Sequence, residues 1–173
     1  MVDTNSNLGI IWTIFFNRLF GPITPLTGEF LGITYPIATN VPAIDTQIDF
    51  KIDQLVKQLD RDRATSSQIK IIFQDKSRKK TGWFSKEDEL IWECWKINVN
   101  CESIDKKNQL KIDRYVQDFE SNVFKIIDII DTHKEHIPAI TSLESSPFPF
   151  LIEISKPDKK DDESWGDYIK KIL

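Results

Sequence analysis

His133 and His136, with Glu135 between them, are the residues in this sequence whose types and spacing could hold a metal ion. Positions three apart on a helix share a face, so both imidazoles could reach one ion. A zinc site needs more protein ligands than two, and no further ligand clusters with this pair. Histidine near the C-terminal end of a helix is also expected from the helix dipole alone. We therefore expect no metal site and no cofactor.

Motifs of other catalytic chemistries are missing from the sequence. It contains no GxGxxG, GxxxxGK[ST] or GxSxG pattern, so it offers neither a dinucleotide or phosphate loop nor a nucleophile elbow. Acidic residues are plentiful, but lysines accompany them, as on a solvated surface. Nothing isolates a pair of carboxylates for acid–base chemistry. These observations predict a protein that is not an enzyme and has no catalytic residues.

Charge, cysteine spacing and hydrophobicity argue against a nucleic-acid-binding, disulfide-bonded or membrane-spanning protein. The net charge of −4 argues against a nucleic-acid partner, since such binding usually needs a basic face. Cys94 and Cys101 lie in one β-like segment, where seven residues span roughly 23 Å, beyond the reach of a disulfide. The apolar run 8–20 is too short to cross a bilayer and lacks the features of a signal peptide. We expect a soluble, intracellular chain with two free thiols.

The stretch KTGWFSK (80–86) places Trp83 and Phe84 side by side among residues typical of a solvated loop. From the residues alone, such a pair more often folds back onto its own domain. Held in solvent, the pair would forgo on the order of 3–5 kcal/mol of burial. An exposed pair would therefore indicate a surface in use, because aromatic side chains dominate the energetics of interface anchors.

Hydrophobic periodicity predicts the elements that would position this loop. Apolar residues recur at helical spacing in three segments and alternate as in strands in four others. The expected helices are 8–20, 48–59 and 105–136, and the expected strands are 29–39, 68–75, 89–101 and 148–155. This order is an α+β pattern with the Trp-Phe loop between two successive strands.

The strand at 89–101 changes phase. Leu90, Trp92 and Cys94 alternate on even positions, whereas Trp95 and the apolar residues after it alternate on odd ones. A strand that keeps one face buried can change phase only by inserting a residue. We therefore predict a β-bulge near Cys94–Trp95.

The segment 105–136 carries the longest helical signal, and its second half is apolar nearly all round. Ile127 belongs to the main apolar stripe, so we expect an aspartate there to unfold the domain. Phe124 and Ile129 fall off the stripe, on opposite flanks. Either this is a central helix enclosed by its own domain, or one flank faces a partner protein. Phe124 and Ile129 are the candidate partner-interface residues.

Several motifs in order resemble the autophagy-related protein 101 family. They are Trp83–Phe84, then IWECWKINV (91–99), KIIDII (125–130) and EHIP (135–138). Each motif alone is weakly specific, and their order and spacing together carry the resemblance. The likeness covers roughly residues 8 to 155.

The resemblance implies a HORMA domain over residues 1–155, a mainly antiparallel sheet backed by helices, with the long helix 105–136 central. The composition of residues 156–173, and not the resemblance, predicts a charged linker and a short C-terminal helix. The resemblance also implies that the protein is a non-catalytic subunit of the autophagy-initiating kinase complex. Such a subunit pairs with and stabilises the HORMA domain of autophagy-related protein 13, in the cytoplasm at the autophagosome assembly site. Trp83 and Phe84 would be an exposed finger that recruits downstream factors.

Two alternative functions are compatible with the same sequence features. Another HORMA adaptor could close a C-terminal belt around a peptide, although the charged stretch 156–164 speaks against a firmly tucked belt. A membrane-surface module could insert Trp83 and Phe84 between lipid headgroups, which would limit membrane contact to the periphery. Relatives can carry a proline between the two aromatics, so the loop tip here differs from that pattern.

Overall fold

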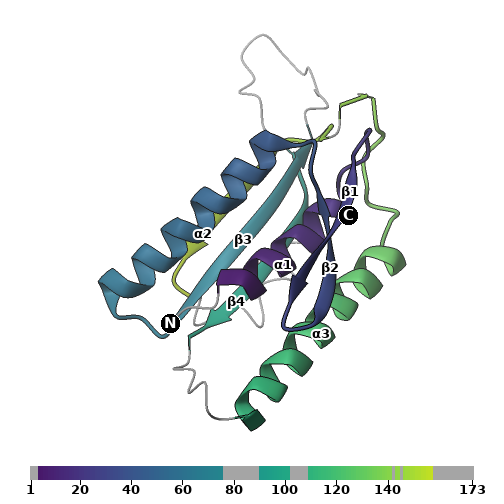
Figure 1. Cartoon of the computed structure of the whole chain (residues 1–173). Helices are drawn as coiled ribbons and strands as arrows, with labels where there is room; N and C mark the ends of the chain where they lie inside the picture. Colours follow the sequence, from purple (N-terminus) through teal and green to yellow (C-terminus); the bar gives the residue numbers. More distant parts are fainter. Residues whose placement is uncertain (1–3, 76–89, 102–108, 142, 145, 158–173) are drawn as a thin grey trace.

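The computed structural model describes residues 4–75, 90–101, 109–141, 143–144 and 146–157 (Figure 1). The elements in chain order are α1 (Thr4–Phe16), β1 (Pro25–Phe30), β2 (Ile33–Ala38), α2 (Pro42–Asp62), β3 (Ser66–Asp75), β4 (Leu90–Asn100), α3 (Gln109–Thr132) and β5 (Phe150–Ser155). The predicted α+β class is confirmed. The strand expected at 29–39 is instead a two-stranded hairpin, because Leu31 and Gly32 both adopt positive φ and reverse the chain.

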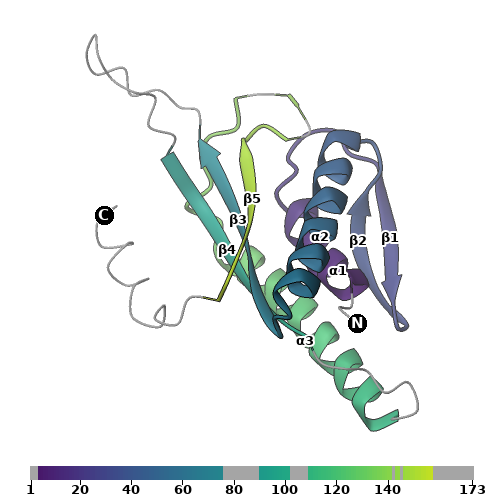
Figure 2. The same cartoon turned by 90° about the vertical axis from the view of Figure 1, so that its left-hand side faces the viewer.

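The described elements form three layers. An antiparallel sheet of order β4-β3-β5 lies on one side and the β1–β2 hairpin on the other. Figure 2 shows α1 and α2 between the two. Phe15 of α1 meets Phe73 and Phe150 edge to face, with ring centroids 5.5 and 4.8 Å apart. The same helix contacts β2, α2 and α3, so the core gathers around α1.

The central helix is therefore α1, and the expectation that the segment 105–136 is central was wrong. Ile11 and Ile14 are fully buried and Ile10 is 8% exposed, although these residues point to different sides of the helix. This helix is therefore buried on more than one side. It begins at Thr4 and ends at Phe16, earlier at both ends than the apolar run suggested.

One face of α3 packs against α1 and forms part of the core. Its buried residues recur at helical spacing and are Phe119, Val123, Ile126 and Ile130. The ring of Phe119 lies directly over Gly9, where a β-carbon would be 2.7 Å away, so the glycine permits the close approach of α1 and α3. Rings of Phe30 and Tyr35 from the hairpin meet the same phenyl ring at 5.0 and 6.0 Å.

The other side of α3 faces solvent. Ile127 is 39% exposed, so its assignment to the buried stripe was wrong. The stripe is narrower than the sequence indicated because α1 covers only one face of this helix. An aspartate at Ile127 can keep its carboxylate in water, and unfolding is no longer expected from that substitution.

We expect Ile126→Asp and Ile127→Asp to differ sharply although the residues are neighbours. Ile126 is 8% exposed, so its replacement buries an unpaired charge and lowers the free energy of unfolding by more than about 4 kcal/mol. Ile127→Asp should cost less than about 1.5 kcal/mol. Urea unfolding followed by circular dichroism measures both. Equal losses of unfolding free energy in the two variants would contradict the assignment of Ile126 as buried and Ile127 as exposed.

Candidate functional site

A β-bulge in β4 organises one end of the sheet. Phe73 of β3 is opposite Glu93, but the next residue, Gln74, is opposite Ile91, so Trp92 is the extra residue. The predicted bulge is present, two to three residues before the predicted position at Cys94–Trp95. A bulge turns two successive side chains toward the same face. It thereby directs both Trp92 and Glu93 toward the helices, where each makes the contacts described below.

Glu93 forms a buried ion pair with Arg18, which follows the C-terminal end of α1. The Nε atom of Arg18 donates to both carboxylate oxygens at 2.9 Å, and Nη2 donates to Oε2 at 2.7 Å. The two side chains are 2% and 9% exposed. Such a two-pronged, charge-assisted contact is among the strongest side-chain interactions in proteins.

Two further groups complete the surroundings of Glu93. Nε2 of His136 lies 2.7 Å from Oε2, and the indole nitrogen of Trp95 donates to Oε1. Burial by itself would raise the pKa of Glu93. The hydrogen bonds and the charge of Arg18, together with the hydrogen bonds from Trp95 and His136, outweigh that effect and hold the pKa below its ordinary value. The carboxylate is therefore ionised in the folded protein at neutral pH.

Trp92 packs beside this ion pair and also contacts aromatic residues of β3 and of the segment before β5. Its ring centroid lies 5.0 Å from that of Phe148 and 5.5 Å from that of Phe73. The guanidinium carbon of Arg18 lies 6.0 Å from the indole centroid, and the His136 ring lies 5.7 Å away. We call Arg18, Trp92, Glu93, Trp95 and His136 the basal cluster.

The basal cluster lies at the end of the sheet where the segment 76–89 connects two strands. Asp75 ends β3 opposite Leu90, which begins β4, so both ends of that segment leave the sheet side by side. Trp83 and Phe84 themselves fall outside the described residues. The structure thus describes the base from which the predicted finger starts, and shows that the base is fastened to α1 and to the chain after α3.

The candidate partner-interface residues occupy different environments on α3. Phe124 is 64% exposed, and Ile127 lies one turn away on the same flank. Ile129 is half-buried and lies on the opposite flank. The structure therefore does not bring the two predicted residues, Phe124 and Ile129, together. It instead pairs Phe124 with Ile127, which the sequence had placed in the core.

The histidines and cysteines considered as metal ligands or thiols in the sequence do not form a metal site in the part of the chain that the structure describes. His136 contacts Glu93, whereas His133 points to solvent from the end of α3. Among the residues described, no three His, Cys, Asp or Glu side chains gather closely enough to bind a metal ion. Cys94 and Cys101 are free thiols, and burial raises the pKa of each. Within the described ranges, no helix is long and apolar enough to cross a membrane.

These features define an α+β domain with an exposed apolar flank on α3 and a buried ion-pair cluster at one end of the sheet. The sequence comparisons give its family. The family model described as "Autophagy-related protein 101" matches residues 4–144, and the chain belongs to that family. A relative of the same name from Arabidopsis thaliana is 28% identical over 95% of this chain and 85% of its own. One from Schizosaccharomyces pombe is 22% identical over 95% and 84%, respectively.

Membership in this family, confirmed by the match, supports a role related to autophagy. The name describes no enzyme. The basal cluster offers no obvious nucleophile or free general base either, because the lone acid, Glu93, is already bonded to Arg18, Trp95 and His136. Its geometry is that of a structural clamp.

We expect Glu93→Gln to lower the free energy of unfolding by about 3–5 kcal/mol at pH 7, since it leaves Arg18 buried without its anion. Because the folded-state pKa of Glu93 is lowered, its contribution is present above its ordinary pKa of about 4.5. That contribution is lost as the pH falls through the lower folded value. Wild-type stability should therefore fall more steeply with acid than that of the variant.

Urea unfolding between about pH 7 and pH 3 measures this difference. Glu153→Gln is the matched control, because Glu153 is exposed on β5 of the same sheet. The control should unfold like the wild type at pH 7. Parallel pH dependences for the wild type and Glu93→Gln would contradict the assignment of Glu93 as the acid-sensitive group.

Proposed function

We propose that this protein is a non-catalytic interaction subunit of the autophagy-initiating kinase complex. It pairs with and stabilises a partner HORMA protein, autophagy-related protein 13, and its own fold is a HORMA domain. Its Trp83–Phe84 finger recruits downstream factors at the autophagosome assembly site in the cytoplasm. The observation that carries the proposal is the family match over residues 4–144.

The base of the finger supports the recruiting role. Arg18 and His136 reach Glu93 from segments that precede and follow the β3–β4 pair. The strand ends that flank residues 76–89 are therefore held by two other parts of the chain. A fixed base lowers the conformational entropy lost when a surface segment binds its target. The scaffold thus suits a segment that must present two aromatic side chains to a partner.

The outer flank of α3 supports the pairing role. Phe124 and Ile127 form an exposed apolar pair on a helix whose other face is locked into the core. Glu120, Asp128 and Asp131 lie around the pair on the same side of the helix. An apolar centre with a charged rim is the usual anatomy of a protein–protein interface. We place the partner on this flank, with Phe124 as its principal anchor.

The double variant Trp83→Ala/Phe84→Ala tests the finger. We expect its melting temperature to stay within about 2 °C of the wild-type value and its recruitment of downstream factors to be abolished. Differential scanning calorimetry and co-precipitation from cell extract measure the two properties. Flotation with anionic liposomes is a parallel assay. Strong lipid binding by the wild type that the double variant loses would favour a membrane-surface role instead.

A drop of many degrees in the melting temperature would show that the two rings belong to the core. That result would remove the physical basis of a recruiting finger, since buried rings cannot serve as an anchor.

Phe124→Asp tests the α3 interface. We expect at least about thirtyfold weaker binding to the HORMA domain of autophagy-related protein 13, since the substitution puts a charge at the centre of an apolar contact. Isothermal titration calorimetry measures the affinity. Leu110→Asp is the matched control because Leu110 is 81% exposed near the start of the same helix. Unchanged binding by Phe124→Asp, with a loss in Ile129→Ala, would move the interface to the opposite flank.

A further inference from the structure

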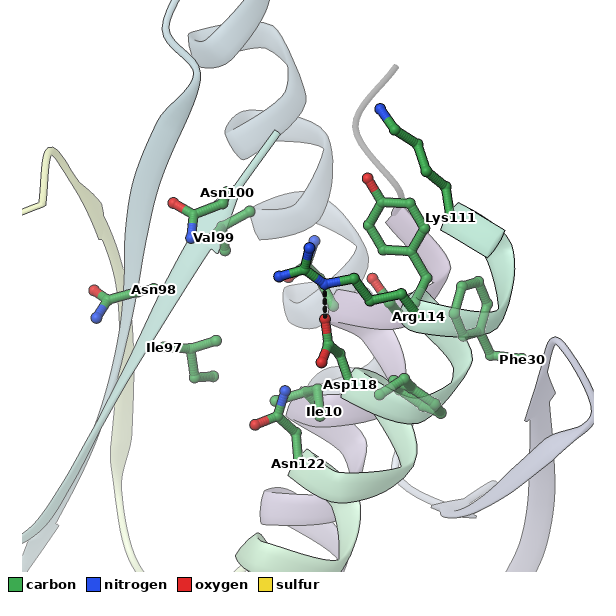
Figure 3. Close-up of a pocket in the computed structure, with 14 residues that line it drawn as sticks. Ile10, Phe30, Ile97, Asn98, Val99, Asn100, Lys111, Arg114, Asp118 and Asn122 are labelled. Atoms are coloured by element: carbon green, nitrogen blue, oxygen red, sulfur yellow. Dashed lines mark ion pairs between the residues drawn. The ribbon is translucent and has the colours of Figure 1, made fainter. Parts of the chain in front are cut away.

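A groove runs between β4 and the N-terminal half of α3, away from both surfaces discussed above. Its volume is about 360 Å³. Figure 3 shows β4 on one side and side chains of α3 on the other. Four consecutive residues of β4, from Ile97 to Asn100, line it. Successive side chains of a strand point to opposite faces, so consecutive residues can line one groove only if it follows the edge of the strand.

That edge is unpaired among the strands that the structure describes, since the sheet order is β4-β3-β5. The amide nitrogen of Cys101 donates to the carbonyl oxygen of Thr65 at 2.7 Å. Hydrogen-bonded and non-bonded pairs alternate in an antiparallel ladder. Cys101, Val99 and Ile97 therefore bond to β3, whereas the main-chain groups of Asn98 and Asn100 point away from β3, into the groove.

The groove combines an apolar floor with a charged wall. Ile10, Val99 and Phe119 form much of the floor and are almost fully buried. Lys111 and Arg114 line the α3 side, where Asp118 is the acidic residue. The ion pair between Arg114 and Asp118 is long, at 3.9 Å, and both side chains are highly exposed. Such a pair is weak and can exchange partners.

We propose that this groove binds an extended segment of a partner protein, which adds to the sheet as a strand beside β4. The outward-facing main-chain groups of Asn98 and Asn100 bond to the segment. One apolar side chain of the segment rests on the floor of the groove. A carboxylate two positions away, on the same face of the added strand, reaches Arg114. The exposed guanidinium of Arg114, whose contact with Asp118 is long, favours an acidic segment over a basic one.

This surface is separate from the α3 interface of the proposed function. Phe124 lies on the far flank of the helix from Asn122, which lines the groove. The two surfaces could be occupied at the same time, and neither proposal depends on the other.

A phage-displayed library of random dodecapeptides, selected on the full chain, supplies the probe. We expect enriched peptides to share an apolar residue and an acidic residue two positions apart. One such peptide, synthesised with a fluorophore, is then titrated by fluorescence polarisation. The absence of enrichment, or enrichment without this spacing, would overturn the proposal.

Asn98→Pro is the main variant, because it removes an outward-facing N–H without removing a main-chain bond to β3. It and Asn98→Ala both lose the side-chain bond that Oδ1 of Asn98 accepts from Nε2 of Gln68 at 3.0 Å, so the comparison of the two isolates the N–H. We expect at least tenfold weaker peptide binding, whereas Asn98→Ala, which keeps the N–H, should bind like the wild type. Arg114→Glu provides a second test at a highly exposed position and should also weaken binding tenfold or more. Arg61→Glu, on α2 and 75% exposed, is its matched control.

N-methylated peptides test the geometry without changing the protein. An added strand bonds to β4 through alternate amides only. Methylating one alternate set should abolish binding, and methylating the other set should leave it intact. Equal effects of the two sets would contradict strand addition. A full chain that dimerises in solution and becomes monomeric in Asn98→Pro would overturn the partner assignment in favour of a second copy of this chain.

Discussion

The burial of the Glu93 carboxylate constrains much of this structure. A carboxylate in the interior is tolerated only with a cation and further donors around it. Arg18, Trp95 and His136 supply them from three different parts of the chain. The end of α1, the first half of β4 and the segment after α3 must therefore meet at one point. A buried pair of this kind contributes little more stability than apolar residues would, but it allows one arrangement of those segments.

The second constraint is the position of α1. Because α1 is apolar on all sides, it requires covers from the sheet, α2, α3 and the hairpin. Each of those elements packs against α1, and α3 keeps its other face exposed. The free flank of α3 is thus a consequence of how the core is filled. Phe124 and Ile127 can be exposed at little cost to folding because Phe119, Val123 and Ile126 already secure the helix.

Periodicity in the sequence was sufficient to predict the three helices, the three strands of the main sheet and the α+β class. It misplaced the bulge because the alternation of apolar residues carries no information on Glu93, a charged residue that faces the helices. Its inward orientation depends on Arg18, which is distant in the chain. Ile127 was misassigned for a related reason, since periodicity shows which residues are apolar but not how wide a face the neighbouring helix covers. The groove beside β4 depends on strand order, which no local pattern encodes.

The contact of Phe15 with Phe150 has a consequence for synthesis. The chain makes α1 well before β5, the strand that shields it. Until β5 leaves the ribosome, α1 lacks one of its covers, and its aromatic side chains remain available to other chains. Folding around α1 must therefore await the synthesis of β5, and contacts so distant in sequence form slowly.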